Sequence, residues 1–206
     1  MAAVAASKTA MTAVAASYVA VAAIYGSTVA VNAVKANGTA WATLTGASSG
    51  VMGKAVAILA GLSPDSYADM TAVAASQTAM TAVAASKTAM TAVAASKTAM
   101  AAVGGSQTAL NAIAASTTAL DALYAKKSRL SGASASKSGK FIILQISTDN
   151  AFSTSNYGYA TLSDGSKPDW SNYRGKYAYF KQYKKVATQM KNDTDSNDWI
   201  DYISCG

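Results

Sequence analysis

The sequence of 206 residues contains no histidine and a single cysteine, Cys205. Histidine is the side chain that most often acts as a general base and as a metal ligand near neutral pH, so its absence argues against the commonest enzyme and metal sites. A single cysteine cannot form a disulfide within the chain, and it is either a free thiol or one half of a bridge between subunits. We therefore expect no catalytic residues, no metal and no cofactor.

Charged residues are also scarce, at 13% of the chain. None lies between Lys8 and Lys35, a stretch long enough to cross a bilayer, which takes about 20 apolar residues. Polar residues such as Ser17, Ser27 and Asn32 interrupt that stretch, so we predict no membrane span. The N-terminus also lacks the basic segment of a signal peptide, and we expect synthesis in a cytoplasm.

The net charge of +7 raises the question of a nucleic-acid partner. In the regular part of the chain the lysines are spread at about one per ten residues instead of being clustered, which gives only a weak electrostatic field. We therefore predict no nucleic-acid partner.

What the sequence has in abundance is a ten-residue repeat. Its cleanest form, TAVAASKTAM, occurs at residues 81–90 and again at 91–100, and degenerate copies extend the pattern from Ala2 to Leu130. Residues 52–60 interrupt the pattern with a nine-residue spacing, so the register slips by one between two blocks. Self-similarity at a fixed period indicates an array in which each unit is completed by its neighbours.

The repeat predicts helix, because alanine is the strongest helix former. We number the unit from its threonine, so that Val83 is at position three, Ser86 at position six and Met90 at position ten. Positions three and ten return to nearly the same face of a helix. The stripe so formed consists of Val73, Met80, Val83, Met90, Val93, Met100, Val103, Leu110, Ile113 and Leu120.

A single copy of this array is not expected to build a thick core, because alanine buries little apolar area and burial contributes only roughly 25 cal/mol per Å². We therefore predict that the stripe is an oligomerisation surface. Ten residues fall roughly 80° short of three helical turns, so the stripe requires a tight left-handed supercoil, or else the region breaks into short helices. The expected fold class is mainly α: an elongated, oligomeric, trimeric helical shaft with a small C-terminal β or α+β head.

The two blocks divide the array into a degenerate segment, 1–60, which is either proximal shaft or attachment region, and a regular shaft, 61–130. Four glycines between Lys35 and Gly53 indicate loop or strand there. The run Ser63-Pro64-Asp65 has the cap hydroxyl, first-turn proline and first-turn acid that open a helix. We expect one helix to run from Pro64 through the regular repeats.

The composition changes after Leu130. Residues 131–139, SGASASKSG, are predicted to be a flexible linker, and residues 140–206 to be the head. The run FIILQI at 141–146 indicates a buried strand. The segment from Tyr177 to Met190 is expected to be a strand followed by a basic helix.

Aromatic and basic residues interleave between Trp170 and Lys185 in the head. Aromatic faces stack on sugars or bases, and lysine and arginine attract phosphates, so this run is the candidate receptor site. The alternative is that Tyr177, Tyr179 and Phe180 belong to the core of a small domain whose surface carries the lysines. The candidate residues are Trp170, Tyr173, Arg174, Lys176, Tyr177, Tyr179, Lys181 and Tyr183.

The regular repeats MTAVAASKTAMTAVAASKTAM, with the lead-in AGLSPDSYADM and the run-out LNAIAASTTALDAL, resemble the alanine-rich decapeptide repeats of bacteriophage tail fibre proteins. The resemblance covers Ala2 to about Leu130. It implies a homotrimeric structural protein of the virion, attached to other tail or baseplate proteins, whose distal domain recognises a glycan or protein of the bacterial surface.

Two further interpretations stay open. The chain is alternatively a self-assembling extracellular or capsid-attached filament protein with no receptor. The acidic run at Asp193, Asp195 and Asp198 is similar to a calcium loop, but the glycine and the final glutamate of such a loop are missing, and we predict no metal there.

Overall fold

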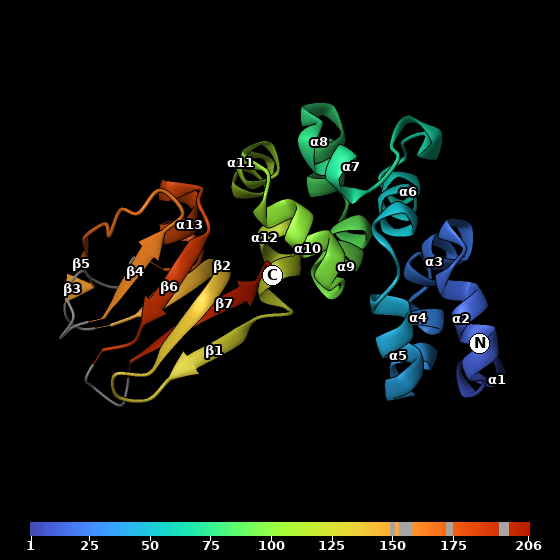
Figure 1. Ribbon diagram of the computed structural model, residues 1–206, viewed down its shortest axis with the longest axis horizontal. Helices are drawn as coiled ribbons and strands as arrows, with labels where there is room; N and C mark the ends of the chain where they lie inside the picture. The colour runs from blue at the N-terminus through green and yellow to red at the C-terminus, as the bar shows by residue number, and fades with distance from the viewer. Residues whose placement is uncertain (149–150, 153–157, 172–174, 194–197) are drawn as a thin grey trace. The chain divides into compact units, whose positions relative to one another are not determined.

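The computed structural model describes residues 1–148, 151–152, 158–171, 175–193 and 198–206. The chain divides into an N-terminal unit, Met1–Ala122, and a C-terminal unit, Leu123–Gly206. It is mainly helical, with a small antiparallel sheet near the C-terminus (Figure 1), as expected. The boundary lies eight residues before the predicted end of the shaft at Leu130.

The N-terminal unit is built from short helices, one for each repeat (Figure 1). Their bounds are α1 Ala2–Ala6, α2 Lys8–Ala15, α3 Tyr18–Tyr25, α4 Thr28–Lys35, α5 Gly38–Thr45, α6 Ser49–Leu59, α7 Met70–Ala75, α8 Gln77–Ala85, α9 Lys87–Ala95, α10 Lys97–Gly104, α11 Gln107–Ala115 and α12 Thr117–Tyr124, with a 3-10 turn at Pro64–Ser66. The prediction of a continuous helix from Pro64 is therefore wrong, and so is that of loop or strand at 35–53, where α5 and α6 lie.

Most breaks fall on position six of the repeat, and the exceptions are the starts of α6 after Ser48 and of α7 after Asp69. Ser86 takes up an extended conformation, φ −92° and ψ 110°, so it ends α8 and caps α9 with its side chain. Its hydroxyl accepts a hydrogen bond from the amide of Ala89 at 3.2 Å. The serine thus satisfies one of the free amides of the first helical turn. The chain turns sharply at such breaks, and α2 and α3 are bent by 101°.

The short helices stack in a solenoid with three helices per turn. Helix α7 packs on α10, α8 on α11, and α6 on α9; α1 to α3 pack in the same way on α4 to α6. The position-six serine also joins neighbouring turns of the solenoid. Ser106 Oγ donates a hydrogen bond to the carbonyl of Ala74 at 2.6 Å, and Ser116 Oγ donates one to the carbonyl of Ala84 at 2.5 Å. Both pairs are 32 residues apart, which is three repeats plus two positions.

The stripe of large apolar residues points into the interior of this solenoid. Val73, Met80, Val83, Met90 and Val93 are 0% exposed within the single chain. The expectation that they form an oligomerisation surface is therefore wrong. The remaining stripe members, Met100, Val103, Leu110, Ile113 and Leu120, are buried as well. Alanines at positions four and nine are buried beside them, and their small size lets neighbouring helices approach closely enough to close a core.

The slip between the two blocks is accommodated around α6. Gly53 lies so close to the start of α7 that a β-carbon there would come within 2.2 Å of the backbone of Asp69. Asp69, and not Ser63, caps the next α-helix, since its carboxylate accepts from the amide of Ala72 at 2.9 Å. The predicted helix start at Pro64 is only a single 3-10 turn.

The C-terminal unit is an antiparallel sheet with strand order β1-β7-β2-β6-β4 and one short helix, α13, against β2. A separate two-stranded ladder pairs β3 with β5. The bounds are β1 Ser128–Ser131, β2 Ser136–Ser147, β3 Ala151–Phe152, β4 Tyr159–Leu162, β5 Trp170–Ser171, α13 Ala178–Tyr183, β6 Ala187–Lys191 and β7 Trp199–Ser204.

The central strand β2 contains the predicted strand at 141–146, and all six of those residues are buried. Two other expectations are wrong. The stretch 131–139 is not a linker, because β1 ends at Ser131 and β2 begins at Ser136. The order after Tyr177 is helix and then strand, α13 before β6, which reverses the expected order.

Candidate functional site

The structure separates the predicted receptor residues into core and surface. Tyr177 and Tyr179 are only 6% and 3% exposed, and Tyr179 belongs to the core cluster of the sheet. They are therefore not available to a receptor, and the alternative interpretation of them as core residues is confirmed. Lys176 and Lys181 are exposed and Tyr183 is half-buried.

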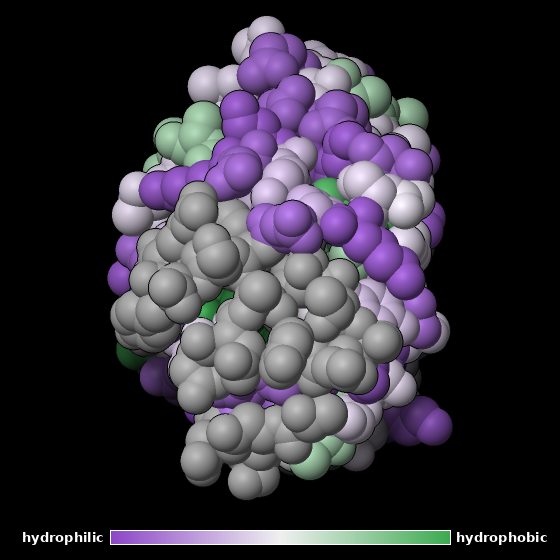
Figure 2. Space-filling view, turned by 90° about the vertical axis from the view of Figure 1, so that its left-hand side faces the viewer, coloured by the Kyte–Doolittle hydropathy of each residue, from purple (hydrophilic) through white to green (hydrophobic). Residues whose placement is uncertain are grey.

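The remaining three predicted residues are Trp170, Tyr173 and Arg174. Trp170 belongs to strand β5, whereas Tyr173 and Arg174 lie outside the described residues. Asp195 of the acidic run lies outside them too. Figure 2 shows one side of the C-terminal unit, and its described residues are mostly hydrophilic.

An exposed basic and aromatic cluster lies around Tyr124, the last residue of α12. The ammonium nitrogens of Lys127 and Lys176 lie 4.0 Å and 4.2 Å from the centroid of the Tyr124 ring. A cation at that distance from an aromatic face is attracted by the quadrupole of the ring. The rings of Tyr124 and Tyr177 form a T-shaped pair, with centroids 5.8 Å apart and planes at 84°. We call Tyr124, Lys127 and Lys176 the lysine–tyrosine cluster.

A buried carboxylate fixes the position of Tyr124. Asp201 on β7 is 0% exposed, and the Tyr124 hydroxyl lies 3.2 Å from its Oδ2 and 3.0 Å from Oε1 of Gln145. The hydroxyl can donate its one proton to either oxygen. The ring that holds the two lysines is thereby anchored to the two central strands, β2 and β7.

Arg129 on β1 completes this arrangement. Its Nε and Nη2 donate to the two oxygens of Asp201 at 2.7 Å and 2.9 Å, a bidentate ion pair. The same guanidinium lies 3.6 Å from the centroid of the Trp199 ring. The hydrogen bonds to Asp201 raise the pKa of Arg129 above its ordinary value. Because Asp201 is neutralised by Arg129, it does not neutralise Lys127 or Lys176.

The described residues offer little for catalysis. They contain no group of three or more histidine, cysteine, aspartate or glutamate side chains that could hold a metal. Cys205 is buried, and burial raises the pKa of its thiol to about 12, so it is a poor nucleophile at neutral pH. The ion pair of Lys185 with Asp164 lowers the pKa of that carboxyl, but Asp164 lies in an exposed turn after β4 and Lys185 in the loop before β6.

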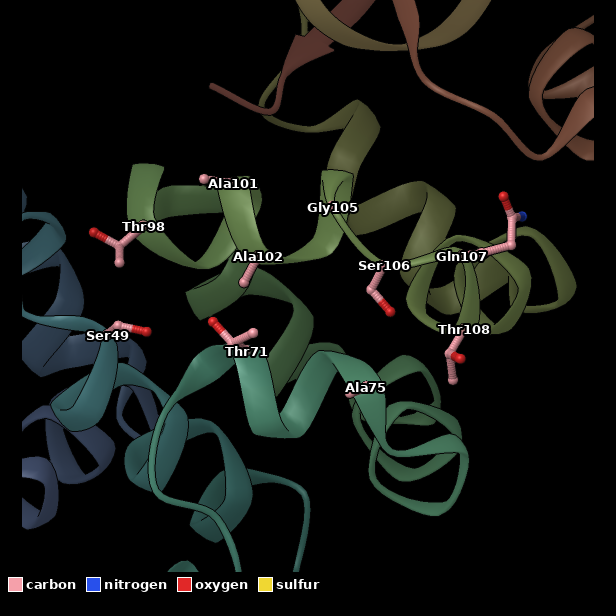
Figure 3. A pocket seen from close by; sticks show the side chains of 10 residues that line it. All are labelled: Ser49, Thr71, Ala75, Thr98, Ala101, Ala102, Gly105, Ser106, Gln107 and Thr108. Carbon is pink, nitrogen blue, oxygen red and sulfur yellow. The ribbon is translucent and has the colours of Figure 1, made fainter. Parts of the chain in front are cut away.

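The solenoid has a hollow of about 660 Å³ between α6, α7, α10 and the start of α11, shown in Figure 3. Thr71 and Ala102 face each other across it, and Ser106 lies at one side. None of its ten lining residues is titratable; they are Ser49, Thr71, Ala75, Thr98, Ala101, Ala102, Gly105, Ser106, Gln107 and Thr108. Hydroxyl and methyl groups alone do not supply acid, base or nucleophilic chemistry, so we do not interpret this hollow as an active site.

No described helix is by itself long and apolar enough to span a membrane, and of the helix pairs only α2 with α3 has a suitable composition, with a 101° bend between them. Searches of protein-family models and of curated proteins found no match to the sequence.

Sequence reasoning missed the lysine–tyrosine cluster as a unit. Tyr124 and Lys127 were assigned to the end of the shaft, while Lys176 was assigned to the receptor run. The segment YAKKSR at 124–129 has one aromatic residue followed by three basic residues, and this combination was the available signal. The contact between Lys176 and Tyr124 joins residues 52 positions apart (176 − 124), which no local pattern predicts.

Proposed function

We propose that this protein is a non-enzymatic structural component of a bacteriophage tail fibre, with a repetitive spacer and a C-terminal unit that binds the host surface. The resemblance of the repeats to those of tail fibre proteins supports the proposal. So does the division of the chain into a regular solenoid and a separate unit with a different composition. Location in the virion, attachment to tail or baseplate proteins and assembly as a homotrimer belong to the same proposal.

The lysine–tyrosine cluster is the observation that carries the binding role. Two exposed ammonium groups lie within about 4 Å of one ring, and both can attract an anionic group near that ring. Lysine attracts phosphate as a positive point charge. An aromatic ring, by its edge or its face, contacts the apolar side of a sugar. The ligand class that fits both features is a phosphate-bearing glycan of a bacterial envelope.

The proposal is tested by binding of the full chain to an immobilised glycan of glucose units joined by phosphodiesters and to a neutral glucan. We expect binding to the phosphate polymer only, with an affinity that falls as salt is added, because exposed charge pairs are screened. The double variant K127Q/K176Q should bind at least about tenfold more weakly, since it removes two cations from the site.

The control is K87Q/K97Q, which removes the same charge from two exposed lysines of the solenoid. Equal losses in both double variants would indicate attraction by net charge alone and would contradict a site at Tyr124. If the wild-type chain binds neither polymer, the alternative of a filament protein without a receptor becomes the better account.

A further inference from the structure

Tyr177 has a backbone conformation that large residues rarely adopt. It lies directly before α13, in the left-handed region, with φ 66° and ψ −6°. A bulky residue with a positive φ is an outlier that costs free energy, and it persists only where its surroundings fix it. The position of the Tyr177 ring is therefore set by a strained backbone that the rest of the fold must hold in place.

A bulge in the central strand β2 holds this backbone. The pairing of β2 with β7 skips Leu144, which lies between the paired residues Ile143 and Gln145. The carbonyl of Leu144 accepts a hydrogen bond from the amide of Tyr177 at 2.6 Å, and Oε1 of Gln145 lies 3.0 Å from the hydroxyl of Tyr124. Bulges redirect groups of a strand in this way, often beside functional sites. One bulge thus fixes both rings of the T-shaped pair.

Fixing Tyr177 also restricts Lys176, the residue before it. The ammonium nitrogens of Lys176 and Lys127 lie 4.2 Å and 4.0 Å from the centroid of the Tyr124 ring. The two nitrogens are therefore no further apart than about 8 Å, the sum of 4.2 Å and 4.0 Å. Two charge-assisted hydrogen bonds of about 2.8 Å to different oxygens of one phosphate span roughly 8 Å. The two lysines are close enough to hold a single phosphate group.

We propose that Lys127 and Lys176 hold one phosphate group between them, and that Tyr177 is the positioning residue that sets Lys176 for it. The inference rests on the proposed binding function and narrows its ligand to a unit of one phosphate with its sugar. Tyr177 is only 6% exposed, so it acts through Lys176 and does not contact the ligand.

The positioning role is tested by the NMR shifts of the Lys176 ε-methylene protons in the full chain. Protons above an aromatic face move upfield, so we expect an upfield position in the wild type and in Y177F, which keeps the ring. Y177L should return these protons to the ordinary lysine position. The control F180L shortens another buried aromatic side chain of α13 and should leave the shift unchanged. An ordinary shift in the wild type, or an upfield shift that Y177L retains, would overturn the positioning role.

The ligand is tested by titration of the full chain with glucose 6-phosphate, which has one phosphate, and with glucose. We expect only glucose 6-phosphate to bind. Y177L should weaken this binding at least about fivefold in the wild type and in a K127Q background. It should cause no further loss in a K176Q background, because no cation is left there for Tyr177 to position. Equal losses in all three backgrounds would mean that Y177L only disturbs the fold, and would overturn the positioning role.

These outcomes are separate from that of the proposed function. The NMR shift needs no glycan, so it tests the role of Tyr177 whether or not the chain binds a host surface. A chain that binds the phosphodiester-linked glucan but not glucose 6-phosphate would keep the proposed function and overturn the single-phosphate site.

Discussion

At the residue scale, the serine at position six explains why this alanine-rich chain does not form one long helix. Alanine favours continuing the helix, but serine competes by capping the next one with its own hydroxyl. Ser106 does this for the amide of Ala109 at 3.2 Å and also donates to the carbonyl of Ala74 one turn earlier. One hydroxyl thus ends a helix, begins another and ties two turns together.

The two roles can be separated by aspartate, which caps a helix but cannot donate. We expect S106D to lower the free energy of unfolding by about 1–3 kcal/mol, because the Ala74 carbonyl loses its donor and faces a carboxylate. The matched variant S17D keeps its cap to Ala20 and should change stability by less than about 0.5 kcal/mol. Urea unfolding followed by helical circular dichroism gives both values. Equal effects would show that the bond between turns contributes nothing.

The buried thiol of Cys205 gives a prediction for pH. Its pKa is raised in the folded protein to about 12 from an ordinary 9.0, so the folded state favours the protonated form. The resulting stabilisation is complete below pH 9 and is lost as the pH rises from 9 towards 12. We expect a thiol reagent at pH 8 to modify the native protein at least about a hundredfold more slowly than the urea-unfolded protein. Similar rates would mean that the thiol is accessible in the native state.

At the element scale, a helix of eight or nine residues is too short to be stable alone, so it depends on the apolar side chains it buries. In α9 those are Met90 and Val93, both fully buried, together with three alanines. The thick core that was not expected from one chain is therefore supplied by the stacking of turns, each of which covers the methionines and valines of the next.

Shortening one of these methionines should be costly. We expect M90A to lower the free energy of unfolding by about 2–5 kcal/mol, and M90L by less than about 1.5 kcal/mol because the volume is kept. The control T81A alters the exposed face of α8 and should be nearly neutral. If the core lies within one chain, the M90A loss measured by urea unfolding is independent of protein concentration. A loss that disappears at high concentration would instead place Met90 in a contact between chains.

At the scale of the whole molecule, the regular units are interchangeable. Stability in a repeat protein is approximately a sum of terms for each unit and its neighbours, and here each helix packs on the third one along. Units 81–90 and 91–100 are identical in sequence, so an added copy meets the same neighbours.

We therefore expect insertion of one further TAVAASKTAM after Met90 to be tolerated, with a helical signal that rises in proportion to the added residues and no loss of stability in urea. Insertion of only TAVAA at the same place should unfold part of the solenoid, because it moves every later serine and methionine off its position. The two insertions are compared by circular dichroism and by resistance to protease. Equal tolerance of both would contradict a stack locked by the ten-residue register.

The sequence by itself determined that residues 2–130 repeat every ten positions, that the repeats are helical, and that the strand at 141–146 is buried. These follow from local preference and from the spacing of apolar residues. Only the tertiary structure decided where the stripe points, because the sharp turn at each serine returns the chain to its own core after three repeats.

The candidate site divides in the same way. The sequence was sufficient to predict that Lys176 is exposed and to suggest the alternative that Tyr177 is a core residue. The pairing of Asp201 with Arg129 and the contact of Lys176 with Tyr124 join strands and a helix end that are distant along the chain. Local patterns carry no information on such contacts, since the order of strands in the sheet creates them.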